Sequence, residues 1–356
     1  MKAKAKKLFT GNGLTYLMVI AAFCILLPLQ QGGHLSRSLS GLLIPICCYM
    51  SLAVSLNLTV GILGELSLGH AGFMCTGAFT AVVVSSVLTD LIPFPSLRLL
   101  IAMVAGALGA AVAGLIIGTP VLRLQGDYLA IVTLAFGQII KEVIGSLFVG
   151  RDSRGLHVLF NLRGTQTLED LHLEEGGTVI IKGAQGAVGT QPIATFTAGF
   201  LLVLFTLAVV LNLSHSRSGR AIMALRDNRI AAESVGISVT KYKMMAFVVS
   251  AALAGAAGAL YGLNYSSMQS AKFDFNTSIL ILVFVVLGGL GNVRGSLIAA
   301  AALTVLPEML REFDTYWKLV YAIVLIAVML IRNNNHCKEL FHQLKVRLHL
   351  TRKEAV

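Results

Sequence analysis

Residues 214–243 have the sequence SHSRSGRAIMALRDNRIAAESVGISVTKYK, and they interrupt a chain that is otherwise largely apolar. The stretch carries six basic residues against two acidic ones, Asp227 and Glu233. Short loops that are rich in Lys and Arg stay on the cytoplasmic side of a membrane protein. We therefore predict a cytoplasmic loop here, and its length and patterning indicate that it contains a helix.

This helix is predicted to start at Arg220, or later with Asp227 as its N-cap, and to end at Gly236. A glycine just past the last turn ends many helices, because it adopts a left-handed backbone without steric cost. The segment is amphipathic but only moderately apolar, so it would not bury itself in lipid. It is typical of a helix that docks in a groove on a soluble partner. The alternative is a solvated, basic loop that faces lipid.

The composition excludes an ordinary soluble protein. Hydrophobic residues make up 56% of the chain and charged residues 13%, about half of the roughly 25% charged residues that soluble domains carry. The net charge is +11, but the basic residues gather in the N-tail, the 214–243 loop and the C-tail. Such clustering sets membrane topology and favours contact with anionic lipid, so we predict membrane lipid and no nucleic acid as a partner.

Ten stretches are long and apolar enough to be membrane spans, given that a spanning helix needs about 20 residues. They are residues 14–30, 38–60, 66–88, 99–121, 128–149, 193–213, 244–265, 276–290, 295–312 and 316–331. The predicted fold class is therefore an all-α polytopic membrane protein with about ten transmembrane helices.

The charges of the connecting segments predict its topology. A basic tail (1–13) in the cytoplasm, followed by six spans within 14–213, returns the 214–243 loop to the cytoplasm. Four more spans within 244–331 bring the basic tail at 332–356 to the same side, so both termini are predicted to be cytoplasmic. The long loop at 150–192 then lies outside the membrane, where it suits docking of a soluble protein or simple solvation.

Glycines recur at a spacing of four residues in three places. In lipid, small residues let helix backbones approach closely, so this spacing predicts tight helix packing. The pairs are Gly114 with Gly118, Gly258 with Gly262, and Gly291 with Gly295.

A few polar side chains lie within or beside the predicted spans: Asn57, Glu65, His70, Thr133 and Gln138. Ionisable groups are costly in a bilayer and often mark a transport path. These five residues are therefore candidates for the substrate pathway. In the alternative interpretation, Glu65 caps a helix at the cytoplasmic face and a neutral His70 is hydrogen-bonded to a neighbouring helix.

Several kinds of chemistry lack their usual sequence patterns. The five cysteines show no CxxC or Cys/His spacing, so we predict neither a metal site nor a disulfide. No phosphate-binding GxxxxGK[ST] loop and no hydrolase motif occurs, so no catalytic residue is assigned and any ATP hydrolysis must come from another chain. An ion-coupled carrier and a membrane enzyme remain alternatives. The latter would rest on His157 and His172, whose spacing fits no known pattern.

Four segments carry a resemblance to a known family. They are GELSLGHAGFMCTGAFTA (64–81), RLQGDYLAIVTLAFGQII (123–140), the stretch from Ser216 to Gly262, and VVLGGLGNVRGSL (285–297). In this order they resemble the membrane permease of bacterial ABC importers for branched-chain amino acids, specifically the longer of the two permeases. The likeness runs from about residue 50 to residue 331.

The resemblance implies a multi-pass permease of the bacterial inner membrane that translocates branched-chain or related amino acids by alternating access. It implies a second homologous permease, two cytoplasmic ATPase subunits and a periplasmic substrate-binding protein as partners. ATP and Mg would bind the ATPases, and this chain would bind no cofactor. Because related permeases carry urea, amides and sugars, a permease for another small solute is the alternative.

Within the loop, AAESVG (231–236) is similar to the coupling loop of importer permeases. The resemblance implies ATPase-coupling roles for Arg220, Arg226, Asp227, Ala231, Ala232, Glu233 and Gly236. The chain departs from the family at GRDSRGLHVLFN (150–161), which replaces a Thr-Gly-Gly-like stretch, and in a longer, more basic tail after Ile331.

Overall fold

A computed structural model describes residues 11–33, 36–124, 126–152, 155–161, 171 and 177–310, together with positions 319, 322, 323 and 326. The chain divides into two compact units, Met1–Ala302 and Leu303–Val356, which are considered separately. The basic tail at 332–356 and most of the N-tail lie outside the described residues, as does the tenth predicted span apart from those four positions.

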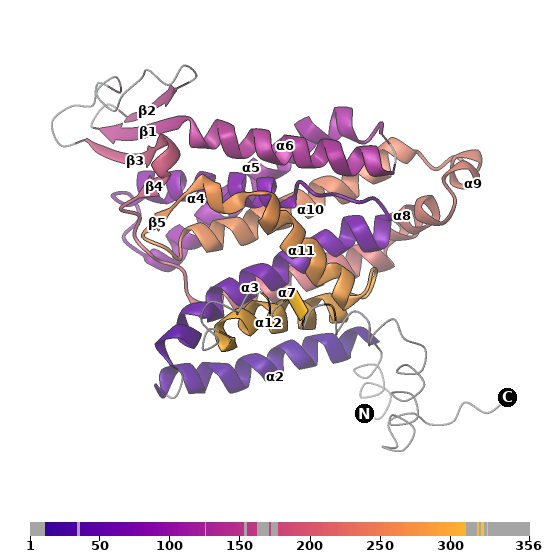
Figure 1. The fold of residues 1–356 in the computed structure, drawn as a ribbon, viewed down its shortest axis with the longest axis horizontal. Coiled ribbons are helices and arrows are strands. Elements are labelled where there is room, and N and C mark those ends of the chain that lie inside the picture. Colours follow the sequence, from indigo (N-terminus) through magenta and orange to yellow (C-terminus); the bar gives the residue numbers. More distant parts are fainter. Residues whose placement is uncertain are drawn as a thin grey trace. The chain divides into compact units, whose positions relative to one another are not determined.

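Helices dominate the described chain (Figure 1). The long ones are α2 (Gly11–Gln31), α3 (Arg37–Asn57), α4 (His70–Val87), α5 (Pro95–Val121), α6 (Asp127–Gly145), α7 (Phe196–His215), α10 (Val239–Gly262), α11 (Phe275–Gly288) and α12 (Val293–Met309). The shorter ones are the π-helical turn η1 (Leu58–Leu63), α8 (Arg217–Asp227), α9 (Arg229–Ser234), and the 3-10 turns η3 (Gly183–Gln185) and η4 (Ser270–Phe273).

These helices confirm a polytopic membrane protein. Nine of the ten predicted spans coincide with helices, and eight segments among the described residues are long and apolar enough to cross a membrane. The ninth, α12, has 17 residues. Because the tenth falls outside the described residues, the total of ten and the side of each terminus remain predictions.

Helix α10 lies at the centre of Met1–Ala302, where it packs on α3, α4 and α5 (Figure 1). Gly114 and Gly118 of α5 face it. A Cβ on Gly114 would lie 2.8 Å from the Cβ of Ala251, and one on Gly118 would lie 2.9 Å from the Sδ of Met244. These glycines therefore allow α5 and α10 to approach closely.

The second glycine pair lies where α10 meets α4. A Cβ on Gly258 would lie only 2.0 Å from the carbonyl oxygen of Met74, and one on Gly262 would lie 3.1 Å from that of Ala78. At Gly258 no side chain fits without moving the backbone, so the contact between α4 and α10 depends on this residue.

The third pair does not lie on one helix. Gly291 is in the turn between α11 and α12 with φ of +79°, and Gly295 is in the first turn of α12. A Cβ on Gly295 would lie 1.8 Å from the carbonyl oxygen of Gly288. The spacing of four here spans a tight turn between two helices and not one helix face, and Gly295 allows α12 to approach the end of α11 closely.

A small sheet accompanies the helical fold that the sequence predicts. Strands β1 (Leu147–Asp152), β2 (Gly155–Phe160), β3 (Thr178–Lys182), β4 (Ala187–Val188) and β5 (Ser267–Met268) pair antiparallel in the order β2-β1-β3-β4-β5. The predicted span ending at 149 stops earlier, because α6 ends at Gly145 and β1 begins two residues later. The sheet lies at the end of the bundle opposite α8 and α9 (Figure 1).

Candidate functional site

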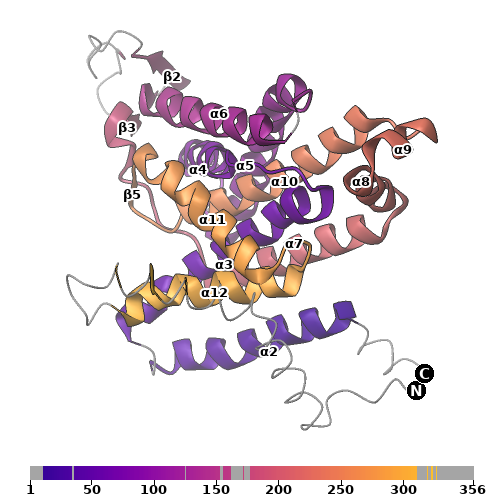
Figure 2. The same cartoon turned by 45° about the vertical axis from the view of Figure 1, so that its right-hand side comes forward.

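The basic loop forms two helices, α8 and α9, which project from one end of the bundle (Figures 1 and 2). A single helix was expected, but Asn228 separates the two with an extended backbone (φ −156°, ψ 106°). Its side-chain oxygen accepts a hydrogen bond from the backbone N–H of Ala231 at 3.0 Å. Asn228 is thus the N-cap of α9, a role that competes with its continuing α8.

Gly236 ends the second helix as its sequence position predicts. Its φ is +85°, and the N–H groups of Gly236 and Ile237 donate to the carbonyl oxygens of Glu233 and Ala232 at 3.0 and 3.1 Å. This pair of bonds is a Schellman motif, which requires a residue in the left-handed region. The chain then turns back into α10 at Val239.

Apolar contacts attach α8 and α9 to the bundle. Ile222 is fully buried in the main core cluster, and Leu225, Ala232 and Val239 form a smaller core that joins α8, α9 and α10. By contrast, Ile230 is 81% exposed, and Val235 just beyond α9 is 75% exposed. The two-helix element is therefore held rigidly on one face and presents apolar side chains on the other.

Arg226 links this element to the rest of the protein. Its Nη1 donates to the carbonyl oxygen of Gly61 in η1 at 3.0 Å, and its guanidinium also contacts Asp227. Gly64, with φ of +82°, lies against the same side chain, because a Cβ there would sit 2.5 Å from the Cγ of Arg226. Movement of α8 would thus act directly on the π-turn that continues α3.

The π-turn is also bonded to the turn between α11 and α12. Buried Asn57 accepts a hydrogen bond from the N–H of Gly291 at 2.9 Å and donates to the Oγ of Ser296 at 3.1 Å. A Cβ on Gly61 would lie 1.8 Å from the Oδ1 of Asn57 and 2.2 Å from the nitrogen of Gly291. Two segments that are far apart in sequence therefore meet without room for an additional methyl group on Gly61.

Glu65 pairs with a cation that sequence reasoning did not assign to the site. Its carboxylate forms an ion pair with Lys243 of α10, and the two side chains are 17% and 5% exposed. Glu65 does not cap a helix, since the next helix begins at His70 with Gly69 in the N-cap position. Two lysines, Lys241 and Lys243, lie in the first turns of α10, and a cation at the start of an apolar span requires a partner.

His70 lies in the bundle interior and is hydrogen-bonded to a neighbouring helix. The hydroxyl of Ser55 donates to the carbonyl oxygen of Leu52 at 2.9 Å, and it is hydrogen-bonded to the ring Nε2 of His70 at 2.8 Å. Ser250 of α10 donates to the carbonyl oxygen of Ser55 at 2.6 Å. A buried polar chain therefore joins α3, α4 and α10, and its serines give no distinctive signal in sequence.

Thr133 holds the loop that leads into α4. Its Oγ1 accepts from the N–H of Leu68 at 3.1 Å, and a Cβ on Gly69 would lie 2.3 Å from its carbonyl oxygen. The N–H of Ala71 donates to the Oγ of Ser278 in α11 at 3.3 Å. The start of α4 is thus fixed between α6 and α11.

The remaining candidates do not join these contacts. Gln138 is half-buried on α6 and forms no hydrogen bond with the described residues, so it is separate from the polar chain of His70. Arg220 bonds locally to the carbonyl oxygen of His215 at 3.2 Å. Ala231 and Glu233 are exposed on α9. No cluster of three metal-ligating side chains occurs among the described residues.

Comparison with known proteins identifies the family. The family model described as the permease component of branched-chain amino acid transport systems matches residues 38–329. No solved structure matches the chain significantly.

Individual relatives agree with this match. The high-affinity branched-chain amino acid transport system permease proteins LivM of Salmonella typhimurium and Escherichia coli are each 33% identical over 293 residues, covering 80% of this chain and 66% of each relative. The LivH permease of Salmonella typhimurium is 24% identical over 80% of this chain and 88% of its own length. The matched region therefore spans a little less than two thirds of the LivM proteins. Because the family model matches most of its length, this chain belongs to the permease components of branched-chain amino acid transport systems.

Proposed function

We propose that this chain is the transmembrane permease subunit of an ATP-driven importer, and that it moves branched-chain amino acids across the bacterial inner membrane by alternating access. The contact that carries the proposal is the hydrogen bond from Arg226 of α8 to the Gly61 carbonyl. It connects an exposed basic element to the π-turn of α3. Such a contact is required if movement of a soluble ATPase is to be coupled to the helix bundle.

The exposed side of α9 fits a groove on a soluble ATPase. Ile230 of α9 and Val235 just beyond it offer apolar anchors beside the basic residue Arg229, and helix-in-groove recognition uses such anchors. The Schellman motif at Gly236 and the cap at Asn228 hold the element rigid. A rigid element can transmit displacement, whereas a flexible loop would absorb it.

Two paths lead from this element into the bundle. Arg226 reaches the π-turn next to Asn57, and the Glu65–Lys243 ion pair joins the loop before α4 to the first turns of α10. Rotation of α8 would therefore shift α3, α4 and α10 together. These are the helices whose interior polar chain includes His70.

The partners follow from the proposed role. They are a second homologous permease, two cytoplasmic ATPases that bind ATP and Mg, and a periplasmic binding protein that delivers the solute. The names of the LivM and LivH relatives support branched-chain amino acids as the solute. The end with α8 and α9 would face the cytoplasm and the sheet would face the periplasm, in agreement with the basic residues of the 214–243 loop.

Reconstitution tests the proposal. The chain is assembled with its ATPases, second permease and binding protein in liposomes, and leucine uptake and ATP hydrolysis are measured. Wild type should take up leucine only with ATP. Arg226→Ala should keep the ATPases bound but lose most ATP-dependent uptake, while Arg217→Ala, which removes the same charge from the exposed start of α8, should transport normally.

Three results would refute the proposal. They are uptake driven by an ion gradient without ATPases, wild-type uptake by Arg226→Ala, and labelling of a cysteine introduced at Val235 from the periplasmic side.

A further inference from the structure

A cavity of about 500 Å³ opens at the end of the bundle opposite α8 and α9. The last turns of α4, the end of β1, and strands β3 and β4 line it. Cavities that bind small molecules have volumes of about 300–1,000 Å³. Its size therefore suits a free amino acid, and none of its residues belongs to the coupling site at the other end.

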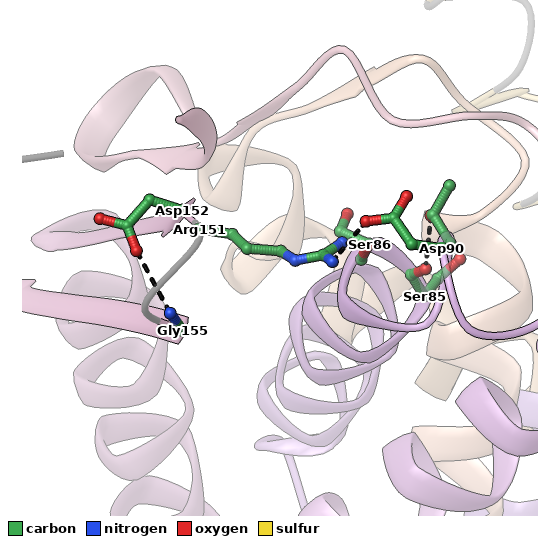
Figure 3. Close-up of polar contacts among 7 residues, drawn as sticks. Ser85, Ser86, Asp90, Arg151, Asp152 and Gly155 are labelled. Atoms are coloured by element: carbon green, nitrogen blue, oxygen red, sulfur yellow. Dashed lines mark hydrogen bonds and ion pairs between the residues drawn. The ribbon is translucent and has the colours of Figure 1, made fainter. Parts of the chain in front are cut away.

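One part of the cavity carries opposite charges. The Nη1 of Arg151 donates to the carbonyl oxygen of Ser86 at 2.8 Å, and its Nη2 forms an ion pair with Asp90 (Figure 3). A guanidinium has five N–H donors, and these two bonds leave three for a ligand. The Asp90 side chain is 72% exposed and so keeps acceptor capacity.

Asp152, the next residue of β1, is already engaged. Figure 3 shows it turned away from Asp90, with its carboxylate accepting from the N–H of Gly155 at 3.2 Å. Its other oxygen lies 3.0 Å from the Nε2 of His157, and its side chain is 1% exposed. Asp90 is therefore the carboxylate that remains accessible beside Arg151.

The rest of the lining combines hydroxyl and aliphatic groups. Ser85, Ser86 and Thr89 of α4 and the turn after it contribute hydroxyls. Five aliphatic residues also line the cavity: Val82, Val179, Ile180, Val188 and Leu263. A paired cation and anion beside an aliphatic wall complement an α-amino acid with an apolar side chain.

We propose that this cavity is an entry subsite for such an amino acid. The substrate carboxylate binds Arg151, its ammonium binds Asp90, and its alkyl group lies against Val179 and Val188, which are the more accessible of the aliphatic lining residues. The inference rests on the proposed function, since it places the same substrate at the face where a binding protein would release it. Arg151 and Asp90 hold each other between transport events and exchange partners with the zwitterion.

Leucine binding to the full chain in lipid nanodiscs tests the subsite without ATP or partners. Saturation-transfer NMR should detect wild-type binding of leucine. Arg151→Gln and Asp90→Asn should each weaken it by at least about tenfold, because each removes a charge-assisted hydrogen bond. Leucinol, which lacks the carboxylate, should bind weakly and be insensitive to Arg151→Gln. 4-Methylpentanoate, which lacks the ammonium, should be insensitive to Asp90→Asn.

The matched controls are Lys141→Gln and Glu142→Gln, which disrupt an ion pair of α6 outside the cavity and should leave leucine binding unchanged. Exchanging the charges of Arg151 and Asp90 distinguishes a role in binding leucine from a role in stabilising the fold. The double variant Arg151→Asp/Asp90→Arg restores an ion pair between β1 and the turn after α4, so its melting temperature should approach that of wild type. Leucine binding should stay lost, because the charges are reversed relative to the aliphatic wall.

The proposal is overturned if wild type shows no leucine binding, if the single variants bind like wild type, or if the charge exchange restores binding. The binding protein itself is the alternative occupant of this cavity. In that case the variants would lose affinity for the binding protein, while their binding of free leucine would be unchanged. This result too would overturn the subsite. Uptake by the full importer without leucine binding here would refute the subsite alone. Leucine binding without ATP-dependent uptake would refute the proposed function alone.

Discussion

Removing either member of the buried ion pair between Glu65 and Lys243 should destabilise the fold, and loss of Glu65 should cost more than loss of Lys243. Replacing Glu65 by Met leaves the Lys243 ammonium, whose side chain is 5% exposed, without a partner. Removing one member of a buried pair costs about 3–5 kcal/mol, because the remaining charge is neither solvated nor neutralised. Lys243→Met instead leaves Glu65, which at 17% exposed is nearer water. We expect a smaller cost there of about 1.5–3 kcal/mol, the range for a lost hydrogen bond to a charged group.

The double variant Glu65→Met/Lys243→Met should cost less than the sum of the single variants. Replacing both members of a buried pair by apolar residues of similar volume is often close to neutral. With single costs of about 3–5 and about 1.5–3 kcal/mol and a double variant close to neutral, the coupling energy should be at least about 4 kcal/mol, which is above the range of about 0.5–3 kcal/mol usual for residues in contact.

Reversible unfolding in mixed detergent micelles, followed by circular dichroism, measures the free energy of unfolding for all four proteins of this cycle. Lys141→Met and Glu142→Met, with their double variant, form a matched cycle for an ion pair that is more exposed and should show coupling below about 1 kcal/mol. Additive costs for Glu65 and Lys243, or a larger loss from Lys243→Met than from Glu65→Met, would show that desolvation of the lysine does not govern this contact.

Three further predictions concern the segments around this pair. Asn228→Ala should cost about 1 kcal/mol by removing the N-cap of α9, and faster hydrogen exchange confined to α9 would be its signature; exchange unchanged there would contradict the role. Asn57→Leu should destabilise the protein by about 1–3 kcal/mol, because the Gly291 N–H loses its acceptor and the Ser296 hydroxyl loses a donor. An unfolding free energy equal to wild type would count against the contact. Gly61→Ala should prevent normal folding because its Cβ would overlap Asn57 and Gly291, whereas Gly236→Val has open space around it. Gly236→Val should cost only about 1–2 kcal/mol of stability through its left-handed backbone. It should reduce uptake and ATPase stimulation without lowering the abundance of the complex. Similar expression levels of the Gly61→Ala and Gly236→Val variants would refute this distinction.

The sequence by itself determined that the chain crosses a membrane many times. Bilayer-spanning segments must satisfy their own backbone hydrogen bonds and face lipid, so length and apolarity alone mark them. For the same reason the stop at Gly236 was predictable, because a left-handed C′ residue is a local backbone requirement. The family could also be recognised, since its motifs are contiguous in sequence.

Tertiary structure alone decided which residues meet. The contact of Arg226 with Gly61 joins positions 165 residues apart, and the ion pair of Glu65 with Lys243 joins positions 178 apart. Nothing in either local sequence specifies its partner. The break at Asn228 was also missed, because the same residue can continue a helix or cap a new one, and packing of Leu225 and Ala232 against Val239 accompanies the second arrangement. The membrane spans can be predicted because each one must be apolar enough to lie in lipid. The contacts of the candidate site depend on how the spans pack together, so only the folded chain brings their side chains together.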